Sequence, residues 1–150
     1  MRVDFYQLSR DSAETALPLI ARASLNAGER LLIVSADDGQ RGRIGEALWT
    51  RQPDSFLAHG QVGGAHDARQ PILIAGPGLI ADNVKPANGA RYLALADGLW
   101  RESEGFVRVF LMFDEATVDG ARACWRLLGE REAVERRFWK QDRAKWVEGP

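Results

Sequence analysis

Leu31-Leu32-Ile33-Val34-Ser35-Ala36 is a short continuous apolar run, and two carboxylates, Asp37 and Asp38, follow it directly. Such a run is typical of a parallel strand that is buried on both faces. On either side of it, the sequence predicts further strands at 3–8, 72–75, 92–95 and 106–113. Helical spacing of apolar residues lies between them, over about 16–27, 44–49 and 117–137. This alternation predicts one α/β domain over residues 1–150, with a mostly parallel or mixed central sheet flanked by helices.

Local signals predict the ends of the first helix and one loop. Asp11 followed by Glu14 resembles a capping box, so a helix should start nearby. Pro18 fits only in the first turn of that helix, and Gly28 should end it. The glycine-rich residues 60–70 are predicted to be the most mobile loop.

Composition excludes several classes of function. The 150 residues carry a formal net charge of −1, so no overall field attracts nucleic acid or acidic lipid. The one cysteine, Cys124, excludes an internal disulfide framework and a thiolate zinc site. The longest apolar runs have about five to eight residues, whereas roughly 18 to 20 span a bilayer, and Asp4 lies where a signal peptide needs its apolar region. We therefore expect a cytoplasmic protein that does not contact a membrane.

Three glycines, Gly39, Gly42 and Gly45, follow the central apolar run. A glycine-rich turn between a strand and a helix is the context of a dinucleotide site. Here, however, the spacing is G-x-x-G-x-x-G, no Walker Lys-Ser/Thr follows, and Asp37 and Asp38 would repel a pyrophosphate. We therefore expect a polar loop that enters a helix, and a small nucleotide-dependent enzyme is a minor alternative.

No catalytic or metal centre is predicted. His59 and His66 lack a matching third ligand, and no G-x-S-x-G motif occurs. The helical pattern around Cys124 indicates a buried thiol. Asp114 and Glu115 follow a strand and are expected to cap the next helix. We therefore expect no intrinsic enzymatic activity, no cofactor and no metal.

The C-terminal end is basic and rich in aromatic residues. Between residues 122 and 145 there are eight Lys or Arg and four Asp or Glu. Arg122 and Arg126 are four residues apart and share a helix face that Trp125 adjoins; Phe138 and Lys140 come later. Guanidinium groups bind carboxylates and aromatic pockets hold apolar anchors, so this end predicts a receptor for an acidic peptide with a hydrophobic end and a free carboxylate. The same residues could stack single-stranded bases, or Trp125 and Phe138 could be core residues below a solvated arginine face.

Four segments carry a resemblance to a known family. They are Phe5-Tyr6-Gln7-Leu8, Ile44-Gly45-Glu46-Ala47-Leu48-Trp49 with Pro53-Asp54-Ser55-Phe56-Leu57-Ala58-His59, Ala121-Arg122-Ala123-Cys124-Trp125-Arg126, and Phe138-Trp139-Lys140-Gln141-Asp142 with Trp146. In this order they resemble the chi subunit family of the bacterial DNA polymerase III holoenzyme. Gly129 departs from the pattern, because the best-known chi proteins have a further Arg there.

The resemblance implies a compact, superficially Rossmann-like α/β fold without a nucleotide cofactor. It also implies a non-catalytic accessory subunit of a DNA-directed DNA polymerase complex in DNA replication. Such a subunit links the clamp loader, through the psi subunit, to the single-stranded DNA-binding protein, and contacts DNA mostly indirectly. A direct single-stranded nucleic-acid-binding protein is the alternative.

The resemblance also implies roles for individual residues. The DNA-binding protein presents an acidic C-terminal tail that ends in Phe. Carried over by position, Arg122 pairs with carboxylates of the tail, Trp125 forms an aromatic wall and Arg126 adds a supporting charge. Phe138 and Lys140 share in tail binding. The surface for psi includes Trp49 and Phe56.

Overall fold

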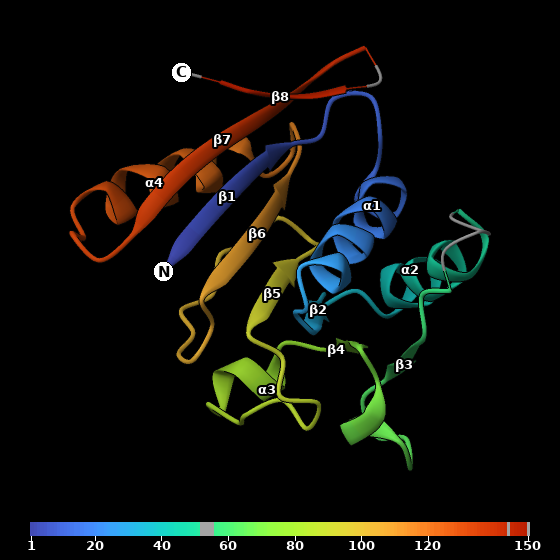
Figure 1. Ribbon diagram of the computed structural model, residues 1–150. Helices are drawn as coiled ribbons and strands as arrows, with labels where there is room; N and C mark the ends of the chain where they lie inside the picture. Colours follow the sequence, from blue (N-terminus) through green and yellow to red (C-terminus); the bar gives the residue numbers. More distant parts are fainter. Residues whose placement is uncertain (52–55, 144, 150) are drawn as a thin grey trace.

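Eight strands form one sheet in the computed structural model, which describes residues 1–51, 56–143 and 145–149. The strands are β1 (Arg2–Gln7), β2 (Leu31–Val34), β3 (His59–Gln61), β4 (Ile72–Ala75), β5 (Tyr92–Leu95), β6 (Arg108–Phe113), β7 (Glu135–Asp142) and β8 (Lys145–Glu148). Their order is β3-β4-β2-β5-β6-β1-β7-β8, and every neighbouring pair is parallel except β7 and β8 (Figure 1). The predicted fold class, a mostly parallel or mixed sheet flanked by helices, is therefore confirmed.

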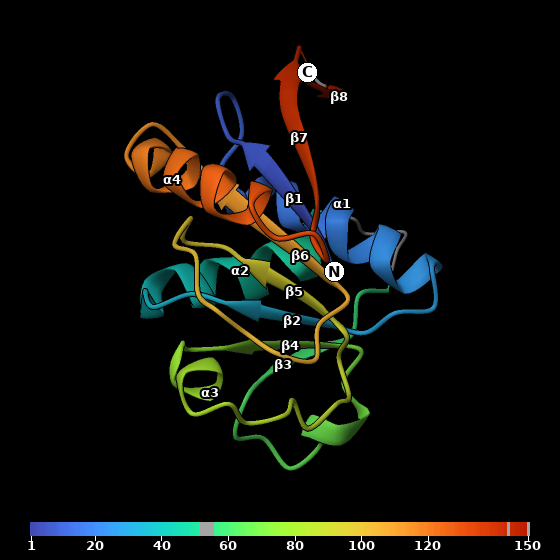
Figure 2. The ribbon, with the colours of Figure 1, turned by 90° about the vertical axis from the view of Figure 1, so that its left-hand side faces the viewer.

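Helices cover both faces of this sheet (Figures 1 and 2). The helices are α1 (Ala13–Asn26), α2 (Asp38–Thr50), α3 (Gly78–Ala81) and α4 (Val118–Gly129), with a 3-10 turn at Asp67–Arg69. Apolar residues of α1 and α2 pack in one core cluster on one face, and those of α3 and α4 pack in a second cluster on the other face. Among the described residues, no helix is long and apolar enough to cross a membrane.

Five strands, β1, β2, β4, β5 and β6, form where the apolar pattern predicts them, whereas β3, β7 and β8 were not predicted. All four residues of β2 and all four of β4 are buried, as expected for parallel strands covered on both faces. β1 lies between β6 and β7, so the first strand of the chain is paired with two strands from its C-terminal third. Its residue Asp4 is fully buried and accepts hydrogen bonds from Arg2, Arg108 and the indole N–H of Trp139. Paired in this way, the buried charge is tolerated.

The predicted helix over about 117–137 is too long. α4 ends at Gly129, and residues from Glu135 onward form strand β7 against β1. The buried helical positions stop at Leu128, and after the turn the side chains alternate between the two faces of the sheet. Pairing with a strand more than 130 residues away therefore decides the conformation of this segment.

The local signals predict the end of α1 correctly but not its start or the place of Pro18. The N-cap is Ser12, whose side chain accepts a hydrogen bond from the Thr15 N–H, so the capping box predicted at Asp11 is wrong. Pro18 lies inside the helix and not in its first turn, which leaves the Glu14 carbonyl without its usual helical donor. Gly28 ends the helix as predicted, with a positive φ of 79°.

In the predicted loop at 60–70, residues up to Gln61 belong to β3 and Asp67–Arg69 form the 3-10 turn.

Candidate functional site

Helix α4 carries the two predicted cations, Arg122 and Arg126, on its outer side. The helix forms because Ala121, Cys124 and Leu128 recur at helical spacing and are buried against the sheet. The expected cap by Asp114 is wrong: the N-cap is Thr117, without a side-chain capping bond, and the Asp114 carboxylate accepts the N–H groups of Ala116 and Thr117 in the turn before the helix. The Arg122 side chain is 69% exposed, and its one ion pair within the described residues joins Nη1 at 4.0 Å to Asp119, which is more exposed still. Both cations are thus at the surface, and the Arg122 pair is too open to be strong.

Trp125 lies half-buried beside the cations and is covered by a residue that the sequence did not single out. Its ring meets Phe5 edge-on, with centroids 5.1 Å apart. The guanidinium of Arg136, from β7, lies 4.3 Å from the centroid of the Trp125 ring, and its Nη1 donates to the Trp125 carbonyl at 2.7 Å. Trp125 is therefore a wall with a cation stacked on it.

Gly129 makes room for this stacked cation. A Cβ at position 129 would lie 2.7 Å from Arg136 Nη1, closer than real Cβ contacts. The guanidinium of Arg136 thus lies where a longer side chain at position 129 would begin. Side chains alternate along β7, and this places Arg136 on the α4 side. The sequence predicts a helix here, so the position of Arg136 was missed.

Phe138 and Lys140 lie on the same side of β7 as α4. Phe138 packs on the α4 core cluster, and its ring is 6.4 Å from that of Phe113. Lys140 is two residues further on and exposed. Gly149 lies against Phe138, and its N–H donates to the Phe138 carbonyl. A Cβ at position 149 would lie 2.3 Å from the Phe138 ring, so a glycine is needed there. The five residues predicted for tail binding are therefore on one face of the molecule.

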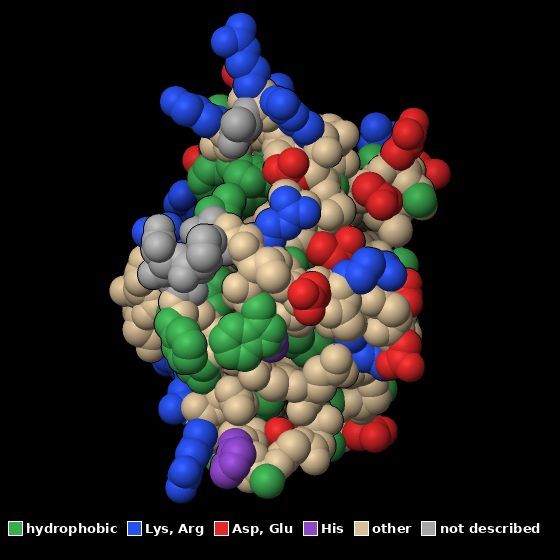
Figure 3. All heavy atoms as spheres, turned by 90° about the vertical axis from the view of Figure 1, so that its right-hand side faces the viewer, with side chains coloured by type: hydrophobic (Ala, Val, Ile, Leu, Met, Phe, Trp, Pro, Cys, Tyr) green, Lys and Arg blue, Asp and Glu red, His purple; other side chains and the backbone are tan. Residues whose placement is uncertain are grey.

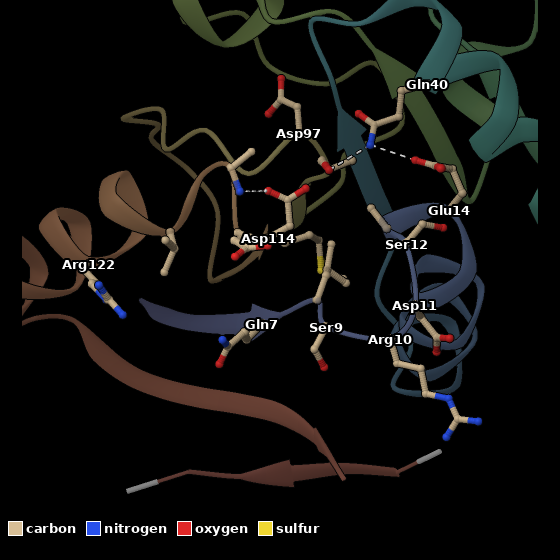
Figure 4. A pocket seen from close by; sticks show the side chains of 17 residues that line it. Gln7, Ser9, Arg10, Asp11, Ser12, Glu14, Gln40, Asp97, Asp114 and Arg122 are labelled. Carbon is tan, nitrogen blue, oxygen red and sulfur yellow. Dashed lines mark hydrogen bonds between the residues drawn. The ribbon is translucent and has the colours of Figure 1, made fainter. Parts of the chain in front are cut away.

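A crevice of about 1170 Å³ opens next to Arg122, at the carboxyl ends of β1, β5 and β6 (Figure 4). β1 continues into α1 on one face of the sheet, whereas β6 continues into α4 on the other. This divergence of neighbouring connections is where ligands bind in open α/β sheets. The charged residues of its lining are mainly acidic: Arg10 and Arg122 are outnumbered by Asp11, Glu14, Asp97, Asp114 and Glu115.

The carboxylates of the crevice have partners of their own. Burial works to raise the pKa of Asp97, but hydrogen bonds from Arg101 and from the Ala36 N–H outweigh it and hold this pKa below its usual value. Asp114 accepts the Ala116 N–H in the turn before α4, and Gln40 donates to Glu14 (Figure 4). These carboxylates would repel the phosphates of a nucleotide inside the crevice. The geometry therefore favours ligand binding at the edge of the crevice, around Arg122.

The glycine motif after β2 does not form the loop that we expected. Gly39, Gly42 and Gly45 all lie within α2. The N-cap Asp37 uses one carboxylate oxygen to accept the N–H groups of Gly39 and Gln40. These are the first free amides of the helix, the groups that would hold a phosphate in a dinucleotide site.

Trp49 and Phe56 form a second surface, on the α1–α2 side of the molecule. They are 52% and 82% exposed, and their rings meet at a centroid distance of 5.9 Å. The His59 ring lies 4.8 Å from that of Trp49. Figure 3 shows large hydrophobic side chains gathered on this side, away from α4. Pro53, Asp54 and Ser55 of the same sequence motif lie outside the described residues.

The two histidines and Cys124 lie apart from one another in the fold. His59 Nδ1 lies 2.9 Å from the Leu57 carbonyl, and His66 precedes the 3-10 turn. Within the described ranges, no group of three or more His, Cys, Asp or Glu side chains is placed to hold a metal ion. Cys124 is buried, as predicted, and burial raises the pKa of its thiol to about 12.

Two sequence comparisons agree on one family. The family model described as "DNA polymerase III chi subunit, HolC" matches residues 1–147. A curated relative, the DNA polymerase III subunit chi of Escherichia coli (strain K12), is 34% identical over 80 residues. That alignment covers 49% of this chain and 54% of the relative, so it spans about half of each protein.

The fold also resembles a solved structure of a different kind of protein. The crystal structure of T4 UvsW matches with a TM-score of 0.64 over 93% of this chain and 41% of that one. The sequences are 11% identical, so this likeness concerns the fold alone.

Proposed function

This chain belongs to the DNA polymerase III chi subunit family, and on that premise we propose that it is a non-catalytic accessory subunit in DNA replication. Its α4 face binds the acidic, Phe-ending C-terminal tail of the single-stranded DNA-binding protein. Its Trp49–Phe56 surface binds the psi subunit and, through psi, the clamp loader. The protein works in the cytoplasm and reaches DNA through these partners.

One observation carries the tail-binding proposal: Arg122 and Arg126 stand exposed on one helix beside the half-buried Trp125. Two guanidinium groups one helical turn apart suit several carboxylates in a row, including a terminal one. Arg126 forms no ion pair with any residue that the structure describes, so its charge is available to a ligand.

The aromatic residues and Arg136 add to this support. Trp125 and Phe138 offer apolar surface on the same side as the cations, which suits the terminal Phe ring of a tail. Arg136 lies over the Trp125 ring and supplies a third cation where Gly129 provides none. Because few residues anchor such a tail, its affinity should be roughly micromolar, about −8 kcal/mol.

Replacing Arg122 tests the proposal. We expect Arg122→Ala to weaken binding of an acidic peptide that ends in Phe by about 1.5 kcal/mol, roughly tenfold, because a charge-assisted hydrogen bond is lost on the bound carboxylate. Calorimetric titration measures the change, and added salt should weaken binding further. Arg91→Ala is the matched control, since that exposed arginine pairs with Glu29, away from α4. Unchanged affinity in Arg122→Ala would remove the role assigned to Arg122.

The psi proposal rests on an exposed aromatic pair. Two large apolar side chains in contact and open to solvent are typical of an interface core. This surface and the α4 face lie on different sides of the molecule, so one subunit can hold both partners at the same time (Figure 1).

A further inference from the structure

A narrow apolar slot lies between α1 and the sheet, on the face opposite α4. Its volume is about 180 Å³. One wall is aliphatic and comes from α1, with Leu19, Ile20 and Ala23. The other wall is aromatic and comes from four strands, with Tyr6, Phe110, Trp139 and Trp146. The slot is therefore separate from both surfaces described above.

The aromatic wall is rigid. The rings of Tyr6 and Trp139 are nearly parallel, with centroids 6.0 Å apart and an interplanar angle of 14°. Trp146, from β8, meets Tyr6 edge-on at 5.0 Å. The indole N–H of Trp139 is tied to the buried Asp4 at 2.8 Å. A wall held in this way can receive an apolar group with little loss of side-chain freedom.

One end of the slot is positively charged. Arg108 lines it, with its guanidinium 4.6 Å from the centroid of the Phe110 ring. Arg108 and Arg2 both donate to Asp4, and within residues 1–51, 56–143 and 145–149 this is the one carboxylate that either arginine pairs with. Two cations on one carboxylate leave a positive charge beside the slot, and both arginine side chains are about one quarter exposed.

The lining favours a peptide over a nucleic acid as the occupant. The volume suits one large side chain, and the α1 wall offers aliphatic groups instead of a second ring to sandwich a base. The hydroxyl of Ser24, a polar group of the lining, already donates to the Ile20 carbonyl. The net charge of −1 further disfavours contact with a run of phosphates.

We propose that this slot is a docking site for a short acidic segment of a protein partner, which inserts one large apolar side chain between Leu19 and Trp146 and places a carboxylate on Arg108. Figure 3 faces the α1–α2 side and shows hydrophobic side chains at the surface in its upper part. The site is independent of tail binding on α4, because the two lie on opposite faces of the sheet.

A peptide without a free carboxyl terminus separates the two sites. The probe is acetyl-Asp-Glu-Phe-Asp-Glu-amide, titrated into the full chain by calorimetry. We expect saturable binding below 1 mM. Leu19→Glu puts a like charge at the mouth of the slot and should weaken binding at least tenfold, because Leu19 is half-exposed and lines the slot. Leu99→Glu is the matched control, since Leu99 is equally exposed elsewhere and should bind as the wild type does.

Three further arms decide the outcome. The same peptide with Ala in place of Phe should bind at least tenfold more weakly, and Arg122→Ala should leave binding of the Phe peptide unchanged. Absence of saturable binding at 1 mM, or equal binding by Leu19→Glu, would overturn the proposal. Binding of a 15-residue oligothymidylate that Leu19→Glu abolishes, without binding of the peptide, would also overturn it in favour of nucleic acid. Loss of peptide binding in Arg122→Ala alone would assign the probe to α4.

Discussion

At the residue scale, burial sets the chemistry of Cys124. Cys124 is 4% exposed, and desolvation, helped by the nearby Glu102 charge, raises the pKa of its thiol from 9.0 to about 12. In the unfolded chain the thiol ionises near pH 9, whereas in the folded protein it stays protonated up to about pH 12. Between these values the folded state binds more protons, so the free energy of unfolding must fall as the pH rises.

This linkage predicts a measurable loss of stability in alkaline solution. The loss due to Cys124 should begin near pH 9 and approach, at most, about 1.4 kcal/mol per pH unit. Tyr6, whose pKa burial raises from 10.0 to about 12, adds to the fall. Urea unfolding of Cys124→Ser at pH 8, 9 and 10 should show a shallower fall than the wild type. Equal slopes for the two proteins, or rapid thiol labelling of the folded protein at pH 8, would contradict the account.

The contact between Arg136 and Trp125 marks the limit of prediction for single residues. Arg122, Arg126 and Trp125 are found by helical spacing, which depends only on neighbouring residues. Arg136 reaches Trp125 because β7 pairs with β1 and because Gly129 has no side chain to block it. The strand pairing is not visible in the local sequence, and the role of Gly129 follows only from that pairing.

At the scale of single elements, the local apolar pattern determines the conformation of some segments and long-range strand pairing determines that of others. The continuous apolar runs of β2 and β4 specify buried strands by themselves, and the structure agrees. The segment from Glu130 to Trp139 has no comparable pattern, and its strand depends on long-range pairing. The glycines of α2 show the converse, since an Asp cap and burial of Ile44 and Leu48 hold them in a helix.

Two glycine substitutions should therefore have opposite effects on the helices. Gly28 has a φ of 79°, and a Cβ there would meet nothing within 4 Å, so Gly28→Ala adds only backbone strain. We expect it to lower the free energy of unfolding by about 1 kcal/mol. Gly42→Ala, in open space within α2, should raise that free energy by about 0.5–1 kcal/mol. Urea denaturation curves measure both, and a destabilising Gly42→Ala would contradict the helical, unobstructed position of residue 42.

At the scale of the whole molecule, the sheet separates two proposed docking faces. Arg122 and Trp125 lie on α4 on one side, and Trp49 and Phe56 lie on the α1–α2 side. An adaptor needs such separation, because its partners must not compete for one surface. The predicted sites follow from family resemblance and from residue type, whereas their placement on opposite faces follows from the order of the strands.

The indole N–H signals of the five tryptophans locate the tail most directly, because these residues are distributed over all the surfaces in question. In ¹⁵N-labelled protein titrated with the acidic, Phe-ending tail peptide, we predict that the Trp125 signal shifts while that of Trp49 stays in place; psi added afterwards should move Trp49. A tail that shifts Trp49, or that shifts Trp139 and Trp146 and leaves Trp125 unmoved, would contradict binding on α4.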